Sequence, residues 1–120
     1  MQSLSHQILL VWGLILSEFT VPLFGAEPPA KPKKISLWTG EMPPSKGAIT
    51  VHMPSQNNGA TIVICPGGGY GGLVTGAEGH GIARWLNKHG IVGVVLEYEL
   101  PKGRSMIPLR DAQRAIRYVR

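Results

Sequence analysis

Residues 60–72 read ATIVICPGGGYGG, an apolar run rich in β-branched side chains that is followed at once by a glycine-rich loop. A continuous run of this kind is typical of a strand that is buried on both faces of a sheet. Glycine at such density lets the backbone adopt positive φ angles and lets a ligand approach the main-chain N–H groups closely. The stretch therefore predicts a central strand over 60–65 that ends in a ligand-binding loop over 66–72.

The segments on either side of this stretch alternate between strand and helix patterns. Short strands are expected over 35–38 and 48–53, and a second buried strand is expected over 91–98, where the sequence reads IVGVVLEY. The order strand, glycine loop, helix, strand, loop, helix is typical of an α/β protein with parallel strands. We therefore predict an α/β fold with a mostly parallel sheet.

Two helices are predicted from the spacing of apolar residues. In the first, Ile82, Trp85 and Leu86 fall at i, i+3 and i+4, and Gly90 is placed to end the helix. Pro108 opens the second helix. The apolar stripe of this second helix consists of Leu109, Ala112, Ala115, Ile116 and Val119.

The amino-terminal segment has the pattern of an export signal. Residues 8–16 form an apolar run that suits a signal peptide and is about half as long as a membrane span requires. We expect a signal peptide over 1–26, a linker rich in proline and lysine over 27–34, and the folded part over 35–120. The protein is then secreted or periplasmic, without stable membrane insertion once the signal is removed.

Composition and charge limit the classes of function. The 120-residue chain is 43% hydrophobic and 16% charged, which excludes a disordered tail, a coiled coil and a collagen-like fibre. Its net charge of +5 belongs to residues 102–120, where six basic side chains accompany one acidic side chain. This pattern is more typical of a solvated helix face than of a nucleic-acid site, and a polyanion-binding fragment stays an alternative.

Cysteine and histidine give no sign of a metal site. The single cysteine, Cys65, excludes an internal disulfide and a multi-cysteine zinc site, and we expect it to pack at the end of its strand. His52, His80 and His89 lack the spacing of metal ligands, so we expect ordinary surface or capping histidines.

Two kinds of chemistry use a glycine loop after a buried strand. In the first, Gly67, Gly69 and Gly72 satisfy the G-x-G-x-x-G pattern of a Rossmann-type NAD-binding module, and Glu97 closes the following strand, where an acid could hold a ribose. That loop needs a helix that starts at the glycines, whereas the helical pattern here starts only near Ile82. In the second, backbone N–H donors form an oxyanion hole for acyl transfer. We favour the oxyanion hole and keep the NAD-binding module as the alternative.

The motif PGGGY, at residues 66–70, resembles the HGGG-type motif of lipases and esterases of the α/β-hydrolase fold. Its form is similar to that of acetylxylan and feruloyl esterase relatives, which act on plant polysaccharides. Segments 78–86, 94–98 and 108–115 resemble the first helix, the next strand and the second helix of that family, in the same order. The resemblance implies the N-terminal portion of a three-layer α/β-hydrolase sandwich, incomplete as given, because the 120 residues contain no G-x-S-x-G nucleophile motif.

This resemblance also implies an activity and a set of site residues. The activity is hydrolysis of carboxylic esters on acylated plant polysaccharide or oligosaccharide by serine acyl transfer, with the catalytic triad beyond residue 120 and the 120-residue stretch inactive alone. Carried over by position, the oxyanion donors are the backbone N–H groups of Gly68, Gly69 and Tyr70. Gly67, Tyr70 and Glu78 are the substrate-binding candidates. The partner is a carbohydrate ester, and neither a metal nor an organic cofactor is implied.

The chain departs from the family at one strand end. Where relatives have Tyr-Arg-Leu, residues 98–100 read Tyr-Glu-Leu. The arginine of the family commonly pairs with an acid, and Glu99 cannot form that pair with Asp111. We therefore expect Glu99 to turn to one of three nearby cations, Arg104, Arg110 or Arg114.

Overall fold

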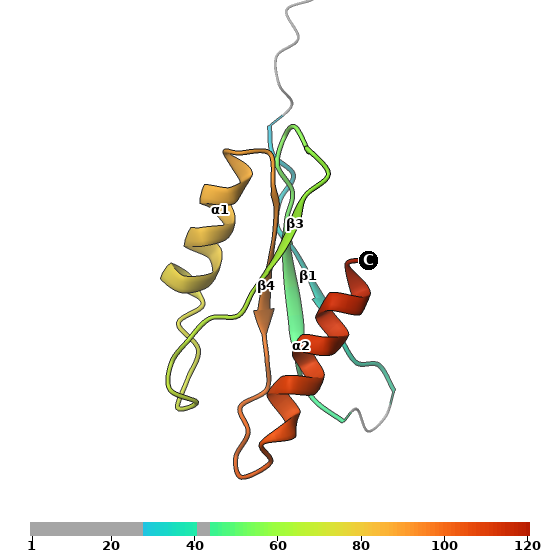
Figure 1. Ribbon diagram of the computed structural model, residues 1–120, viewed down its shortest axis with the longest axis vertical. Helices are drawn as coiled ribbons and strands as arrows, with labels where there is room; N and C mark the ends of the chain where they lie inside the picture. The colour runs from blue at the N-terminus through green and yellow to red at the C-terminus, as the bar shows by residue number, and fades with distance from the viewer. Residues whose placement is uncertain (1–27, 41–43) are drawn as a thin grey trace, which may run out of the picture.

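The computed structural model describes residues 28–40 and 44–120 of the chain (Figure 1). Its four strands are β1 (Lys33–Ser36), β2 (Ala48–His52), β3 (Thr61–Ile64) and β4 (Val92–Glu97). They form one sheet in the order β1-β2-β4-β3. The β1–β2 and β2–β4 pairs are antiparallel, and β3 pairs with β4 in parallel. The α/β class is confirmed, but the predicted mostly parallel sheet is wrong for the described strands, which form a mixed sheet.

The connections between the strands explain this mixed pairing. Strand β2 lies beside β1 and runs in the opposite direction. From β3 to β4 the chain instead crosses over through a helix, which is the connection that a parallel pair requires. The alternation of strand and helix therefore predicted the direction of this one pair only.

Helices cover both faces of the sheet (Figure 1). The π-helical turn η1 (Gly76–Gly81) and the short helix α1 (Ile82–Asn87) lie on one face, and α2 (Met106–Tyr118) lies on the other. Strand β4 is buried on both faces, as predicted, because Val95 packs under α1 while its neighbour Val94 packs on the side of α2. Two apolar clusters result, one on each side of the sheet.

Gly90 closes the turn that follows α1, at the position predicted to end the helix. Gly90 has a φ of 73°, and its N–H donates to the Asn87 carbonyl at 3.1 Å. The N–H of Ile91 donates to the Leu86 carbonyl, also at 3.1 Å. These two bonds form a Schellman motif, and the apolar contact that accompanies it is made by Leu86 and Ile91.

The face that α1 buries differs from the predicted one. Ala83 and Leu86 are buried, whereas Ile82 and Trp85 are exposed. The cause lies in β4, where a Cβ added to Gly93 would sit 2.7 Å from the Cα of Ala83. Two small residues thus let helix and strand approach closely, and this contact turns Ala83 toward the sheet.

Helix α2 buries only part of the predicted stripe, namely Ala115 and, in part, Ala112 and Val119. It begins two residues before Pro108, and Leu109 and Ile116 of the predicted stripe are exposed. The buried positions are Ile107, Asp111 and Ala115. The carboxylate of Asp111 accepts hydrogen bonds from Trp38 Nε1 and Ser45 Oγ, each at 2.7 Å, and from the Glu99 N–H at 2.8 Å. These bonds turn a charged position inward, which the apolar spacing could not indicate.

The first strand begins inside the segment predicted as a linker. Strand β1 starts at Lys33, and residues 28–32 carry no regular structure. Lys34 reaches across the sheet to form an ion pair with Glu97. The predicted signal peptide over 1–26 lies outside the described residues. In the described part of the chain, no helix is both long and apolar enough to cross a membrane.

Strand β3 is an edge strand of the described sheet, although its apolar run is typical of a strand buried on both faces. Thr61 and Ile62 are exposed, because β4 is the sole neighbour of β3 among the described strands. The opposite edge, β1, carries Lys33 and Lys34, which discourage edge-to-edge pairing, whereas β3 carries no charge. A β-branched run cannot indicate by itself whether a second neighbour is present.

We expect the 120-residue chain, produced alone, to self-associate through this uncharged edge. Replacement of Ile62 with lysine should shift it toward monomer, because a charge at the edge opposes strand pairing. Sedimentation velocity measures the change. The matched control is Ile82→Lys, since both isoleucines are 43% exposed but Ile82 lies on a helix. A monomeric wild-type chain with a cooperative melt, or equal effects of the two lysines, contradicts the prediction.

Candidate functional site

The glycine loop follows β3 at the carboxyl end of the parallel pair, where ligands of open α/β sheets bind. Within it, the Gly71 N–H donates to the Gly68 carbonyl at 3.1 Å. The two central residues of this turn, Gly69 and Tyr70, have φ angles of 58° and 59°. Positive φ at both central positions is the mark of a type I′ turn. Tyrosine adopts this conformation rarely, and such strain gathers at functional sites.

Gly68 cannot be replaced without a backbone shift. Its φ is 139°, a value that residues with a side chain rarely adopt. A Cβ built at this position would also overlap the carbonyl oxygen of Gly72. Gly72 itself has nothing within 4 Å of such a Cβ. The loop therefore depends on the absence of a side chain at Gly68 and not at Gly72.

The carbonyls of the loop fix the direction of its N–H groups. The Gly67 carbonyl accepts a hydrogen bond from the Val74 N–H at 2.9 Å, and the Gly68 carbonyl accepts from Gly71. In a trans peptide the N–H points opposite to the carbonyl, so the N–H groups of Gly68 and Gly69 point away from these acceptors. The N–H groups of Gly68, Gly69 and Tyr70 have no hydrogen-bond acceptor among the described residues.

An open hollow of about 490 Å³ lies beside the loop. The glycine loop, the end of β4 and the first turns of α2 enclose it. Its lining residues are Cys65, Pro66, Gly67, Gly68, Gly69, Tyr70, Leu96, Tyr98, Ser105, Pro108, Leu109 and Ala112. The three residues that carry the donor candidates, Gly68, Gly69 and Tyr70, therefore line the same hollow as several apolar side chains.

Two tyrosines and a cysteine shape this hollow. The Tyr98 hydroxyl donates to the Pro66 carbonyl at 2.8 Å, and the Tyr70 ring meets the Tyr98 ring edge-on at 6.3 Å between centroids. Burial, together with Tyr70, raises the pKa of Tyr98, so its hydroxyl stays a donor at neutral pH. The prediction that Cys65 packs in the interior is wrong, because its side chain is exposed beside the loop. Partial desolvation raises the pKa of the Cys65 thiol, which keeps it protonated at neutral pH.

The structure places the other predicted site residues in two groups. Gly67 and Tyr70 line the hollow, whereas Glu78 does not. The Glu78 carboxylate instead accepts a hydrogen bond from the Gly67 N–H at 2.8 Å. Glu97, the acid of the NAD-binding alternative, is engaged by Lys34 and accepts a 3.3 Å bond from Thr50. Helical structure begins at η1, earlier than the predicted start at residue 82.

Glu99 pairs with one of the three expected cations, Arg104. Glu99 forms an ion pair with Arg104 at 2.9 Å and accepts a hydrogen bond from the Lys46 N–H at 2.7 Å. The bond from Lys46 lowers the pKa of Glu99, and Arg104 adds to the effect. Arg114 has a structural role, since it donates to the Leu37 carbonyl at 3.1 Å and stacks on Trp38. Part of the basic stripe on α2 is thus used within the fold.

Sequence reasoning missed a pair of histidines. His52 on β2 is buried, and its Nε2 lies 2.9 Å from Nδ1 of His80 in η1. Burial lowers the pKa of His52, with further contributions from His80 and Arg84. The expectation of ordinary surface histidines is therefore wrong for His52. The two residues are 28 positions apart in the chain, so no local signal could join them.

Acidification should destabilise the protein through this pair. His52 binds a proton less readily in the folded chain than in the unfolded chain, where the pKa of this histidine is near 6.5. The contribution of neutral His52 to the free energy of unfolding is therefore complete above pH 6.5. It is lost as the pH falls toward the lower pKa of His52 in the folded chain. The melting temperature, measured from about pH 7.5 to pH 5.5, should fall more steeply for wild type than for His52→Gln. His89→Gln, at an exposed ring, should keep the wild-type slope, and an unchanged slope in His52→Gln contradicts the prediction.

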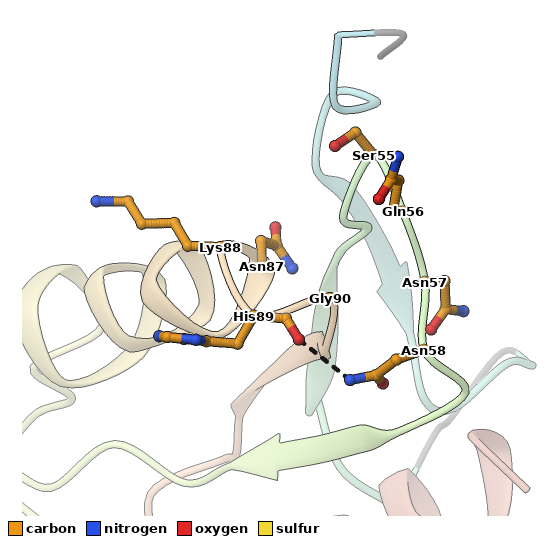
Figure 2. Close-up of a pocket in the computed structure, with 8 residues that line it drawn as sticks. All are labelled: Ser55, Gln56, Asn57, Asn58, Asn87, Lys88, His89 and Gly90. Carbon is orange, nitrogen blue, oxygen red and sulfur yellow. Dashed lines mark hydrogen bonds between the residues drawn. The ribbon is translucent and has the colours of Figure 1, made fainter. Parts of the chain in front are cut away.

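A second hollow, of about 500 Å³, lies where β3 and β4 begin, at the opposite end of the parallel pair from the glycine loop (Figure 2). The loop before β3 and the end of α1 form it. Two of its side-chain amides are used in local structure, since Asn58 donates to the His89 carbonyl at 3.1 Å and Asn57 accepts from the Gly59 N–H at 2.8 Å. Because these groups already have partners, we take the glycine loop as the candidate site. In the described part of the chain, no three His, Cys, Asp or Glu side chains are grouped to hold a metal ion.

Comparison with known proteins yields a partial esterase match. No protein-family model matches the chain. The chain is 40% identical over 75 residues to an acetylxylan esterase of Xylanibacter ruminicola. The aligned part is 62% of this chain and 16% of that protein, so the chain spans a small part of the relative's length. This similarity supports a distant relationship to ester hydrolases.

Proposed function

We propose that the protein is a carboxylic ester hydrolase of the α/β-hydrolase type that acts on acylated plant polysaccharide or oligosaccharide. The observation that carries the proposal is the glycine loop, whose N–H groups at Gly68, Gly69 and Tyr70 face no acceptor among the described residues. The match to an acetylxylan esterase supports the same reaction class. Export, predicted from residues 8–16, would bring the protein to a polymeric substrate.

The chemistry proposed for this loop is stabilisation of an oxyanion. A serine oxygen attacks the acyl carbon, and the carbonyl oxygen becomes negative as the tetrahedral intermediate forms. Fixed N–H donors stabilise this charge by about 3–4 kcal/mol each, because they need no reorganisation during the reaction. The bond from the acyl carbon to the sugar oxygen then breaks, and this oxygen leaves as a hydroxyl with the proton that a histidine took from the serine. Water then hydrolyses the acyl-enzyme, which releases the acid and restores the serine. The serine, histidine and acid are proposed to follow residue 120.

The arrangement of the hollow fits an acyl group beside the donors. Leu96, Pro108 and Leu109 provide an apolar wall, and the Tyr70 ring projects at the rim with most of its surface exposed. A small acyl chain would face the wall, while an exposed aromatic ring is suited to contact the sugar. We propose Tyr70 as a substrate contact for this reason, and Gly67 as a second contact because it also lines the hollow.

The NAD-binding alternative has weaker support. Its acid, Glu97, already forms an ion pair with Lys34. Its helix would have to begin at the last glycine of the pattern, Gly72, whereas η1 begins at Gly76. The wide π-helical turn also differs from the α-helical N-terminus that binds a pyrophosphate.

Two measurements on the protein as its gene encodes it separate these functions. We expect saturable hydrolysis of 4-nitrophenyl acetate and release of acetate from acetylated xylo-oligosaccharides. Titration with NAD, followed by tryptophan fluorescence, should show no saturable binding. Saturable NAD binding without ester hydrolysis would contradict the proposal.

A further inference from the structure

We propose that three consecutive residues of η1, namely Glu78, Gly79 and His80, form a clamp that holds the glycine loop in its donor geometry. Glu78 binds the glycine loop, Gly79 packs against β4, and His80 binds β2. Glu78 is then a positioning residue and not a substrate contact. The inference rests on the ester hydrolase function proposed above for the loop, although the clamp itself can be measured without that activity.

Glu78 holds the residue that precedes the first donor. Its Oε2 accepts the Gly67 N–H at 2.8 Å, and a Cβ added to Gly67 would lie 2.8 Å from the same oxygen. The Gly67 carbonyl is bonded in turn to the Val74 N–H. Both polar groups of Gly67 are therefore engaged, and the second one belongs to the peptide whose N–H is that of Gly68. A carboxylate is suited to this position because it strengthens a bond from a backbone N–H.

Gly79 brings η1 against the sheet directly beneath the loop. A Cβ at this position would lie 2.7 Å from Cγ1 of Val95 and 3.2 Å from Cγ of Pro66. Gly79 is buried, and Pro66 begins the loop. The missing side chain thus sets the distance at which the Glu78 carboxylate meets Gly67.

His80 ties the same turn to a second strand. Its ring nitrogen lies 2.9 Å from that of His52 on β2. Within the turn, the His80 N–H donates to the Thr75 carbonyl at 2.7 Å and the Glu78 N–H donates to the Val74 carbonyl at 3.1 Å. Val74 therefore links the two segments, because its N–H holds the loop and its carbonyl holds η1. The clamp joins β2, β4 and the glycine loop through one wide turn.

Replacement of Glu78 by alanine and by glutamine tests the clamp in the protein as its gene encodes it. Glutamine retains an oxygen that can accept the Gly67 N–H, whereas alanine retains none. We expect Glu78→Ala to lower kcat by about 10- to 100-fold, because small displacements of catalytic groups have effects of this size. The KM should change by less than about threefold, and Glu78→Gln should keep kcat within about threefold of wild type, since Gln can still orient the loop.

A second readout is independent of activity. Hydrogen–deuterium exchange of peptides that cover residues 66–74 should become faster in Glu78→Ala and stay near wild type in Glu78→Gln. The matched control is Glu99→Ala, which removes another carboxylate that accepts a backbone N–H and should leave exchange in the loop unchanged. Melting temperatures identify any variant that fails to fold. If Glu78→Ala fails to fold, the kcat, the KM and the loop exchange of Glu78→Gln test the clamp.

The outcomes are distinct for each proposal. If wild type hydrolyses no ester, the proposed function fails, while faster loop exchange in Glu78→Ala would still support the clamp. Unchanged exchange in Glu78→Ala would overturn the clamp. So would an equal rise of KM in the alanine and glutamine variants, because that result would make Glu78 a substrate contact.

Discussion

Replacement of Gly68 by alanine is expected to lower kcat/KM for ester hydrolysis by about 100-fold or more, the loss that follows removal of one oxyanion donor. The alanine Cβ would overlap the Gly72 carbonyl, and the φ of 139° is unfavourable for any side chain. The turn must therefore rotate, and the N–H groups of Gly68 and Gly69 turn with it. Steady-state kinetics on 4-nitrophenyl acetate measure the loss.

Gly72→Ala is the matched control for this prediction. It introduces the same methyl group into the same loop, at a position with nothing within 4 Å. We expect its kcat/KM to stay within about threefold of wild type, because a loop residue without strain or overlap tolerates alanine. If both variants retain full activity, the loop does not supply the oxyanion donors.

Replacement of Asp111 by alanine is expected to lower the free energy of unfolding by about 3 kcal/mol or more, since each buried donor left without a partner costs about 1–3 kcal/mol. Asp111 is fully buried and accepts hydrogen bonds from Trp38, Ser45 and the Glu99 N–H. It therefore joins α2 to the end of β4 and to the loop before β2. Chemical denaturation of the protein as its gene encodes it measures the change.

Two further variants separate the role of these hydrogen bonds from a general effect of mutation. Asp111→Asn keeps the shape but turns an N–H donor toward another donor, and should cost about 1–3 kcal/mol. Arg110→Ala, at the exposed neighbouring position, should change the free energy of unfolding by less than about 0.5 kcal/mol. A loss in Asp111→Ala no greater than that in Arg110→Ala would contradict the account of α2.

Much of the fold could be predicted because its signals are local. The strand over 92–97, the helix end at Gly90 and the crossover between β3 and β4 all follow from short runs of sequence. The faces of α1 and α2 could be predicted only in part from apolar spacing. Ala83 faces the sheet because Gly93 opposes it, and Asp111 faces inward because three donors meet it. These causes lie on other elements of the fold.

In the candidate site, too, some features could be predicted from the local sequence and others depend on segments far apart in the chain. Glycine density predicted a loop with positive φ angles after β3, since backbone freedom is a property of the residues themselves. The fixing of those groups depends on Val74 and on the carboxylate of Glu78, which lie on the following turn. The pair of His52 and His80 and the exposure of Cys65 depend on how distant segments meet. Such features become visible only when the chain is folded.

The most direct test of the central claim is a crystal structure of the full gene product after inactivation by an aryl phosphonate ester, whose phosphoryl oxygen takes the place of the oxyanion. We predict that this oxygen lies about 2.7–3.1 Å from at least two backbone nitrogens among Gly68, Gly69 and Tyr70, the range for oxyanion-hole donors. A phosphoryl oxygen held by other groups, with these three N–H groups directed elsewhere, would contradict the claim.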